Sequence, residues 1–190
     1  MLADARGETV AVLDACVLLP ASLRDTLLRL AERPRMYTPK WSNQIWAEVT
    51  RNLESRRKLT AENIAYLTAQ VQLHFPEAEV EGYEKLTAAM TNDPKDRHVV
   101  AAAVQAKAQV IVTSNLKDFP RSSLAEWQIE ARRPDQFLTD LYALDPKTVI
   151  SRLREQAATI GRSLPDLLTT LRLGAPNFAV MIAAKELDQP

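Results

Sequence analysis

The chain has 190 residues, of which 46% are hydrophobic and 25% charged, enough apolar material for one globular domain or a domain with an appendage. Its 24 basic and 24 acidic residues cancel, its single Cys excludes an internal disulfide and a cysteine zinc site, and its two His disfavour a histidine-rich metal site. No apolar run approaches a membrane span, and residues 1–10 lack the apolar segment of a signal peptide. We therefore expect a soluble, cytoplasmic protein with no membrane partner.

The first predicted strand, residues 10–13, leads directly into an acid. Asp14 stands within the apolar run VAVLDACVLL, so we expect its carboxylate to be at least partly buried. A buried carboxylate is costly unless a cation, a hydrogen-bond cage or a metal satisfies it. The alternative is an ordinary Asp that caps a loop. Nearby Cys16 fits a small buried side chain better than a redox switch.

Two helices are predicted in the next segment. Residues 21–33 form an amphipathic pattern, and a minor strand at 36–38 follows. A capped helix over 42–55 comes next, in which Glu48 lies roughly 60° round the axis from the apolar Ile45. Glu48 therefore borders the apolar stripe, where it either faces a cleft at the edge of the core or is an ordinary solvated residue.

Basic residues gather where that helix ends. The segment RNLESRRKL includes Arg56 and Arg57. Cations near a helix C-terminus complement the helix dipole, and the same cluster could contact the phosphates of a nucleic acid, so two interpretations stay open. A further helix is predicted over 60–75, and a short helical pattern follows at 84–90.

The most informative stretch is DPKDRHVVAAAVQAKAQVIVTSNLKDFP, residues 93–120. Asp93 followed by Pro predicts a helix start, with Asp96 in the first helical turn. A buried strand is predicted at 109–112, and the polar turn after it carries Asp118. Each acid also has a purely structural explanation, since a first-turn acid suits the helix dipole and an Asp suits a turn.

The rest of the chain changes character. The elements predicted there are an edge strand at 127–130 and helical patterns at 134–144, 146–158, 163–172 and 176–187. Because no strand signal follows the first of these helices, we divide the chain into an α/β domain, residues 1–145, and a C-terminal helical extension, residues 146–190. The leucine-rich face of the extension suits packing on the core or on a partner helix.

Four acids have a plausible common location. Parallel strands present their carboxyl ends at one edge of a sheet, and helices begin at that edge, so acids at strand ends and in first helical turns can meet there. The candidates are Asp14, Glu48, Asp96 and Asp118. Crowded carboxylates repel one another and a divalent cation relieves the repulsion; all-oxygen ligands favour Mg²⁺ or Mn²⁺. Such an ion can activate water against a phosphodiester.

The sequence offers no signature of other catalytic chemistry. There is no G-x-S-x-G motif, the four Gly form no phosphate-binding loop, and His98 has no candidate nucleophile beside it. A dehalogenase-type phosphotransfer domain expects D-x-D after the first strand, and Cys16 stands where the second acid would be.

These motifs resemble the PIN-domain family of metal-dependent ribonucleases, in particular VapC-type toxins of toxin–antitoxin pairs. The resemblance covers roughly residues 8–140 and rests on VLDACVLL, SNQIWAEV, RRPDQFL and the stretch from NDPKD to KDFP. It implies a three-layer α/β/α fold with a central parallel sheet, in which residues 1–145 would be the nuclease domain. The tail from about residue 146 is longer than a minimal PIN domain requires.

The resemblance also implies a function. The residues that would hold Mg²⁺ or Mn²⁺ are Asp14, Glu48, Asp96 and Asp118. Asn115 would be a polar neighbour, and the reaction would be endonucleolytic cleavage of RNA by metal-activated water. A cognate antitoxin would dock near the site, and a homodimer is expected. The candidate RNA-binding cations are Lys95, Lys117, Arg56 and Arg57. The alternative is a non-catalytic RNA-binding or regulatory module on the same fold.

Overall fold

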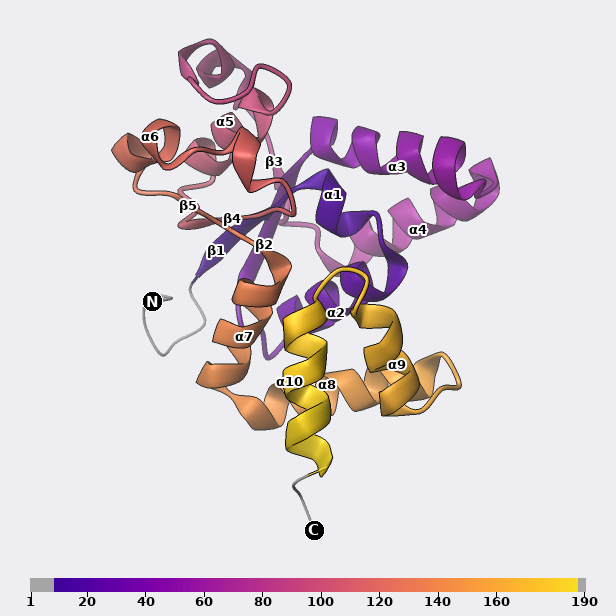
Figure 1. Cartoon of the computed structure of the whole chain (residues 1–190). Helices are drawn as coiled ribbons and strands as arrows, with labels where there is room; N and C mark the ends of the chain where they lie inside the picture. The colour runs from indigo at the N-terminus through magenta and orange to yellow at the C-terminus, as the bar shows by residue number, and fades with distance from the viewer. Residues whose placement is uncertain (1–8, 188–190) are drawn as a thin grey trace.

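A five-stranded, all-parallel sheet forms the centre of the protein, which we describe from a computed structural model of residues 9–187 (Figure 1). The strand order is β3-β2-β1-β4-β5. The strands are β1 Val10–Leu13, β2 Thr38–Ser42, β3 Glu79–Val80, β4 Val110–Val112 and β5 Glu130–Arg132. The expectation about residues 1–8, that no signal segment lies there, falls outside the described residues.

The two central strands explain why the sheet is parallel and covered. Strands β1 (VAVL) and β4 (VIV) contain only apolar residues, with no alternation of polar and apolar positions. All but the first of these residues are buried. Such strands need an apolar layer on each face, and helices on both sides of the sheet supply it (Figure 1). The predicted three-layer α/β/α fold with a central parallel sheet is confirmed.

Ten α-helices and three short 3₁₀ turns are assigned among the described residues. The α-helices are α1 Ala15–Leu18, α2 Ala21–Ala31, α3 Asn43–Arg57, α4 Ala61–His74, α5 Arg97–Gln105, α6 Arg121–Leu124, α7 Pro134–Leu144, α8 Pro146–Thr159, α9 Leu164–Leu171 and α10 Pro176–Leu187. The 3₁₀ turns are η1 Glu84–Ala89, η2 Leu116–Asp118 and η3 Ala125–Trp127. Several helices begin where a hydroxyl or carboxylate side chain accepts a backbone N–H, as at Ser42 and Ser163.

Strand β2 is an interior strand rather than the minor strand predicted at 36–38. Local sequence rules do not favour a central strand across Pro39, because Pro has no N–H to donate to a neighbouring strand. Trp41 donates its N–H to the carbonyl of Ala78, the residue directly before β3 (3.0 Å). By the two-residue alternation of a strand, the backbone nitrogen at position 39 points to the same side. Strand β3 starts only at Glu79, opposite Trp41, so the missing donor at Pro39 costs no ladder bond.

Two further boundaries differ from the sequence prediction. Strand β5 occupies 130–132 instead of 127–130, because Gln128 has a left-handed backbone (φ 56°) that ends η3 and prevents an extended chain there. Helix α5 begins at Arg97, not after Asp93. Asp93 instead closes a turn, in which its side chain accepts the N–H of Lys95 at 3.0 Å, and Asp96 is the N-cap.

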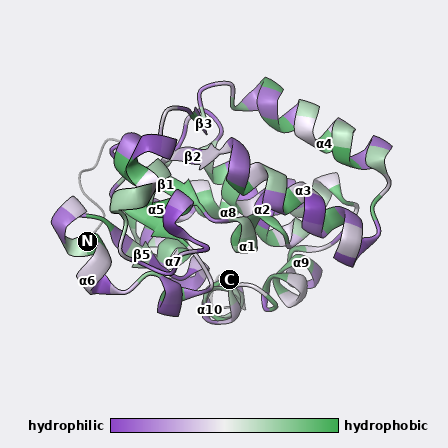
Figure 2. Cartoon of the chain, turned by 90° about the horizontal axis from the view of Figure 1, so that it is seen from above, coloured by the Kyte–Doolittle hydropathy of each residue, from purple (hydrophilic) through white to green (hydrophobic). Residues whose placement is uncertain are grey.

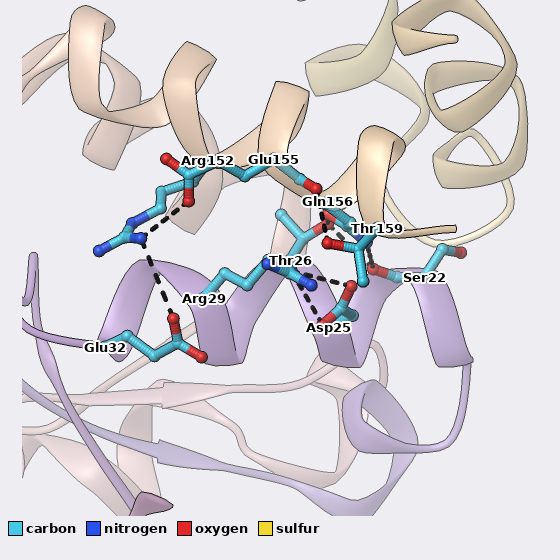
Figure 3. A network of polar contacts seen from close by, with 9 residues as sticks. All are labelled: Ser22, Asp25, Thr26, Arg29, Glu32, Arg152, Glu155, Gln156 and Thr159. Atoms are coloured by element: carbon cyan, nitrogen blue, oxygen red, sulfur yellow. Dashed lines mark hydrogen bonds and ion pairs between the residues drawn. The ribbon is translucent and has the colours of Figure 1, made fainter. Parts of the chain in front are cut away.

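The predicted C-terminal helices form and pack on the core. Helix α8 lies on α2 through a polar network (Figure 3). In it the Thr26 hydroxyl donates to Gln156 Oε1 (2.7 Å), and Gln156 Nε2 donates to the carbonyl of Ser22 (2.9 Å). Thr26 and Gln156 are 2% and 1% exposed, so this contact lies inside the protein. Helix α7 contacts both α8 and α10, and Asp135 on α7 accepts the backbone N–H of Phe178. The boundary at 145/146 stays a prediction.

Hydropathy follows this arrangement (Figure 2). Most helices turn green, apolar faces inward and purple faces outward. Helix α4 lies at the periphery, where Val71 is its one buried residue. Within residues 9–187 no helix is both long and apolar enough to span a bilayer.

Candidate active site

Asp14 sits at the carboxyl end of β1, and its carboxylate is caged by hydrogen bonds. Its backbone N–H donates to Val112 at the end of β4 (3.1 Å), which joins the two central strands at this edge. Its Oδ2 accepts from the Thr113 hydroxyl (2.7 Å) and from the Cys16 thiol (3.0 Å). The side chain is 6% exposed. The expectation of a buried acid is confirmed.

Thr113 and Cys16 hold this carboxylate, and the sequence did not single out Thr113 for this role. Thr113 is fully buried at the end of β4 and also accepts the N–H of Asn115 (3.0 Å). Burial, together with the charge of Asp14, raises the pKa of the Cys16 thiol to about 12. The thiol therefore stays protonated and donates, which suits a structural residue better than a redox-active one.

Asp96 lies within electrostatic reach of Asp14 and Asp118. Burial is the main cause that raises the pKa of Asp96 from 3.8 to about 6, and the negative charges of Asp14, Asp118 and Asp93 raise it further. His98 acts in the opposite direction. The structure thus places Asp14 and Asp118 within electrostatic reach of Asp96, and we call these three residues the three-acid group. It adds Asp93, which the sequence presented only as a helix cap.

Asp118, the last residue of η2, is held by its own neighbours. Asn115 donates its side-chain amide to Oδ2 of Asp118, so the predicted polar neighbour contacts an acid directly. The backbone carbonyl of Asp118 accepts from the Asn92 side chain (3.3 Å) and from the N–H of Asp93 (3.4 Å). These bonds join the β4 exit to the turn before α5.

Glu48 reaches this edge from α3 by a different contact. Its Oε1 lies 3.0 Å from Nε2 of His98, two residues beyond Asp96 on α5. The Glu48 side chain is 29% exposed and that of His98 is 4% exposed. Glu48 is not among the charges that chiefly set the pKa of Asp96. It therefore lies beside the three-acid group rather than inside it.

The donor set suits a hard divalent cation. Asp14, Asp96 and Asp118 offer carboxylate oxygens, and Asn115 adds an amide, which are ligand types that Mg²⁺ and Mn²⁺ favour. After the larger effect of burial, the charges of Asp14 and Asp118 raise the pKa of Asp96, and a cation would relieve this repulsion. As the side chains of residues 9–187 stand, however, no three His, Cys, Asp or Glu are grouped closely enough to hold an ion. Metal binding would therefore require the acids to draw together.

The four predicted RNA-binding cations fall into two groups. Lys95 and Lys117 are exposed in the turns that carry Asp96 and Asp118. Arg56 and Arg57 are exposed at the end of α3, about 12 Å along the helix axis from Glu48 at 1.5 Å per residue. Among the described residues none of these four cations forms a salt bridge.

A parallel sheet with acids gathered at its carboxyl edge defines the architecture of a PIN domain. A family model described as "PIN domain" matches residues 10–117, more than half of the chain, and the chain belongs to this family. A second model, described as "VapC50 C-terminal domain", matches residues 134–184, which span α7 to α10 except for the last residues of α10. That match begins before the boundary that we predicted at residue 146.

One curated relative matches about half of the chain. It is a Mycobacterium tuberculosis protein named "Putative ribonuclease VapC50", with 46% identity over 101 residues. The aligned part is 52% of this chain and 60% of the relative, so the match spans less than two thirds of the relative's length. No solved structure matches the chain.

Proposed function

We propose that the protein is an endoribonuclease that hydrolyses RNA phosphodiester bonds with Mg²⁺ or Mn²⁺. The observation that carries the proposal is the placement of three acids from separate segments: Asp14 directly follows β1, Asp118 ends the turn after β4, and Asp96 is the N-cap of α5. After burial, the charges of Asp14 and Asp118 are the next causes of the raised pKa of Asp96, which supports their proximity to it. Membership of the PIN-domain family and the printed name of the relative support the same activity.

The proposed metal ligands are Asp14, Glu48, Asp96 and Asp118. The bound ion would activate a water molecule and stabilise negative charge that develops on the phosphodiester. Thr113 and Cys16 both bond Oδ2 of Asp14, which holds this carboxylate and leaves Oδ1 for a ligand. Asn115 holds Asp118 in the same way.

The chain's own cations would bind the substrate. Lys95 and Lys117 flank the acids and would contact the phosphate backbone on either side of the cleaved bond. Arg56 and Arg57 would hold a more distant part of the RNA. Because the local positive charge offsets the acids, an overall neutral protein can still bind a polyanion.

The biological role that we propose is the toxin of a type II toxin–antitoxin system. The two VapC50 matches support this role. A cognate antitoxin, a homodimer and a cytoplasmic location belong to the same proposal. Co-expression of the chain with the product of a neighbouring open reading frame, followed by gel filtration, tests the antitoxin and the oligomeric state.

Cleavage of a labelled RNA by the purified chain tests the activity. We expect turnover in Mg²⁺ or Mn²⁺, none in EDTA, and none by Asp14→Asn, while Asp145→Asn at the distant α8 cap cuts as the wild type does. Undiminished cleavage by Asp14→Asn would show that the active site lies elsewhere. RNA binding that is weakened by salt but never followed by cleavage would identify the alternative, a non-catalytic RNA-binding module.

A further inference from the structure

His98 is a buried polar residue whose position the proposed chemistry does not by itself explain. It is the second residue of α5 and is 3% exposed. The next five residues of the helix, residues 99–103, are all buried and all apolar. An apolar side chain at position 98 would suit this layer, since a buried polar group is unfavourable unless it is hydrogen-bonded.

Glu48 is the group that His98 contacts. Nε2 of His98 lies 3.0 Å from Oε1 of Glu48, and neither ring nitrogen has an aligned hydrogen bond within the described part of the chain. The distance is that of a hydrogen bond, but the N–H does not point along the line to the oxygen. Alignment would require the Glu48 carboxylate or the His98 ring to turn. Contacts in functional sites are often misaligned in this way before the ligand binds.

The other acids show what kind of contact this is. Asp14 is held by Thr113 and Asp118 is held by Asn115, in each case by a donor that bonds one carboxylate oxygen. Glu48 is longer and more flexible than an Asp, so it has more rotamer freedom to lose. His98, on the helix that Asp96 caps, is the side chain with a nitrogen within hydrogen-bond distance of Glu48.

We propose that His98 is a positioning residue that directs the Glu48 carboxylate toward the three-acid group. The inference rests on the proposed function, because it assigns Glu48 to the metal site. Once aligned, Nε2–H would donate to Oε1 and leave the other oxygen of Glu48 to hold the cation. Partners of this kind, which bond a metal ligand from behind, commonly change metal affinity by about 10–100-fold.

Calorimetric titration of the metal-free full chain with Mn²⁺ alone tests the proposal without a cleavage assay. We expect His98→Leu to weaken Mn²⁺ binding by about tenfold or more. His98→Gln places an amide N–H near the position of Nε2 and should restore most of the affinity. His98→Asn is too short to reach Glu48 and should behave like His98→Leu. Thr26→Val, a buried change at the α2–α8 contact, should leave Mn²⁺ binding unchanged.

A double-mutant cycle with Glu48→Gln separates this inference from the proposed function. If Glu48→Gln binds Mn²⁺ as the wild type does, Glu48 is not a ligand and that part of the proposed function is wrong. If Glu48→Gln weakens binding but His98→Leu does not, the positioning role is wrong. The positioning role also fails if His98→Leu weakens binding further in the Glu48→Gln background, because no ligand then remains to be positioned. Comparison of the Gln and Asn variants keeps the test valid if His98→Leu does not fold.

Discussion

Asp96→Asn should stabilise the metal-free protein at neutral pH. The pKa of Asp96 is raised from 3.8 to about 6, first by burial and then by Asp14, Asp118 and Asp93. A pKa difference of about 2 corresponds to roughly 3 kcal/mol at 1.36 kcal/mol per unit. Because Asp96 is only partly buried, solvent screening reduces this to about 1–2 kcal/mol. The Asp96 side chain makes no capping hydrogen bond, so Asn loses no such contact.

The sign of the pH dependence follows from the direction of the pKa change. The folded protein binds a proton at Asp96 more readily than the unfolded chain does. The ionised carboxylate therefore destabilises the folded state above about pH 6, and this penalty disappears as the pH falls toward 4. Asparagine removes the penalty at every pH, so the difference between variant and wild type should be largest at pH 7.5 and vanish near pH 4.

Urea and thermal unfolding in EDTA at pH 7.5, 6 and 4 measure this difference. For a chain of this length a gain of 1–2 kcal/mol raises Tm by about 2–8 °C. Asp145→Asn is the matched control, because hydrogen bonds from Thr148 lower the pKa of Asp145, and this variant should be less stable at pH 7.5. If Asp96→Asn is no more stable than the wild type at pH 7.5, or its gain does not change with pH, the acids are not crowded as described.

Three other changes test the contacts described above. Thr113→Val removes a donor to a buried carboxylate and should lower the free energy of unfolding by about 1–3 kcal/mol, and also slow RNA cleavage. Thr26→Val and Gln156→Leu should each lower the free energy of unfolding in urea by a similar amount. The double variant should lose less than the sum of the two, because neither partner is then left unpaired. Strict additivity would contradict a direct contact. Replacing Lys95 and Lys117 by Gln should weaken RNA binding at low salt and reduce the salt slope by about 2, and an unchanged slope would place RNA elsewhere.

The sequence reveals the sheet because its central strands are continuous apolar runs. β1 and β4 were predicted within one residue of their bounds, and the acids that end or follow them were identified from position alone. The C-terminal helices were also found, since their caps are local signals. Local patterns therefore account for most of the architecture and for the positions of Asp14 and Asp118 after neighbouring strands.

Contacts between segments that are distant in the sequence could not be predicted from local patterns. Thr113 lies 99 residues from Asp14, and no local pattern marks it as the donor to that carboxylate. In the sequence His98 has no feature that distinguishes it from other helical residues. Its contact with Glu48 of α3 is visible only in the folded structure. The two-residue strand β3 is too short to show a periodicity. Pro39 hides β2 in the sequence because a Pro is tolerated there only since β3 begins beyond it, opposite Trp41.

The way the C-terminal helices attach has a consequence for how the protein can be controlled. Helix α2 follows the segment that carries Asp14, and α8 and α9 both contact it. A β-carbon at Gly174, in the α9–α10 connection, would lie 2.9 Å from the Leu23 side chain, so the backbone there lies directly against α2. Removing these helices would uncover Thr26 and other buried groups of α2. We therefore expect the C-terminal helices and the α/β core to unfold in one cooperative transition. These helices could then not detach from the core as a switch while the acids stay in place.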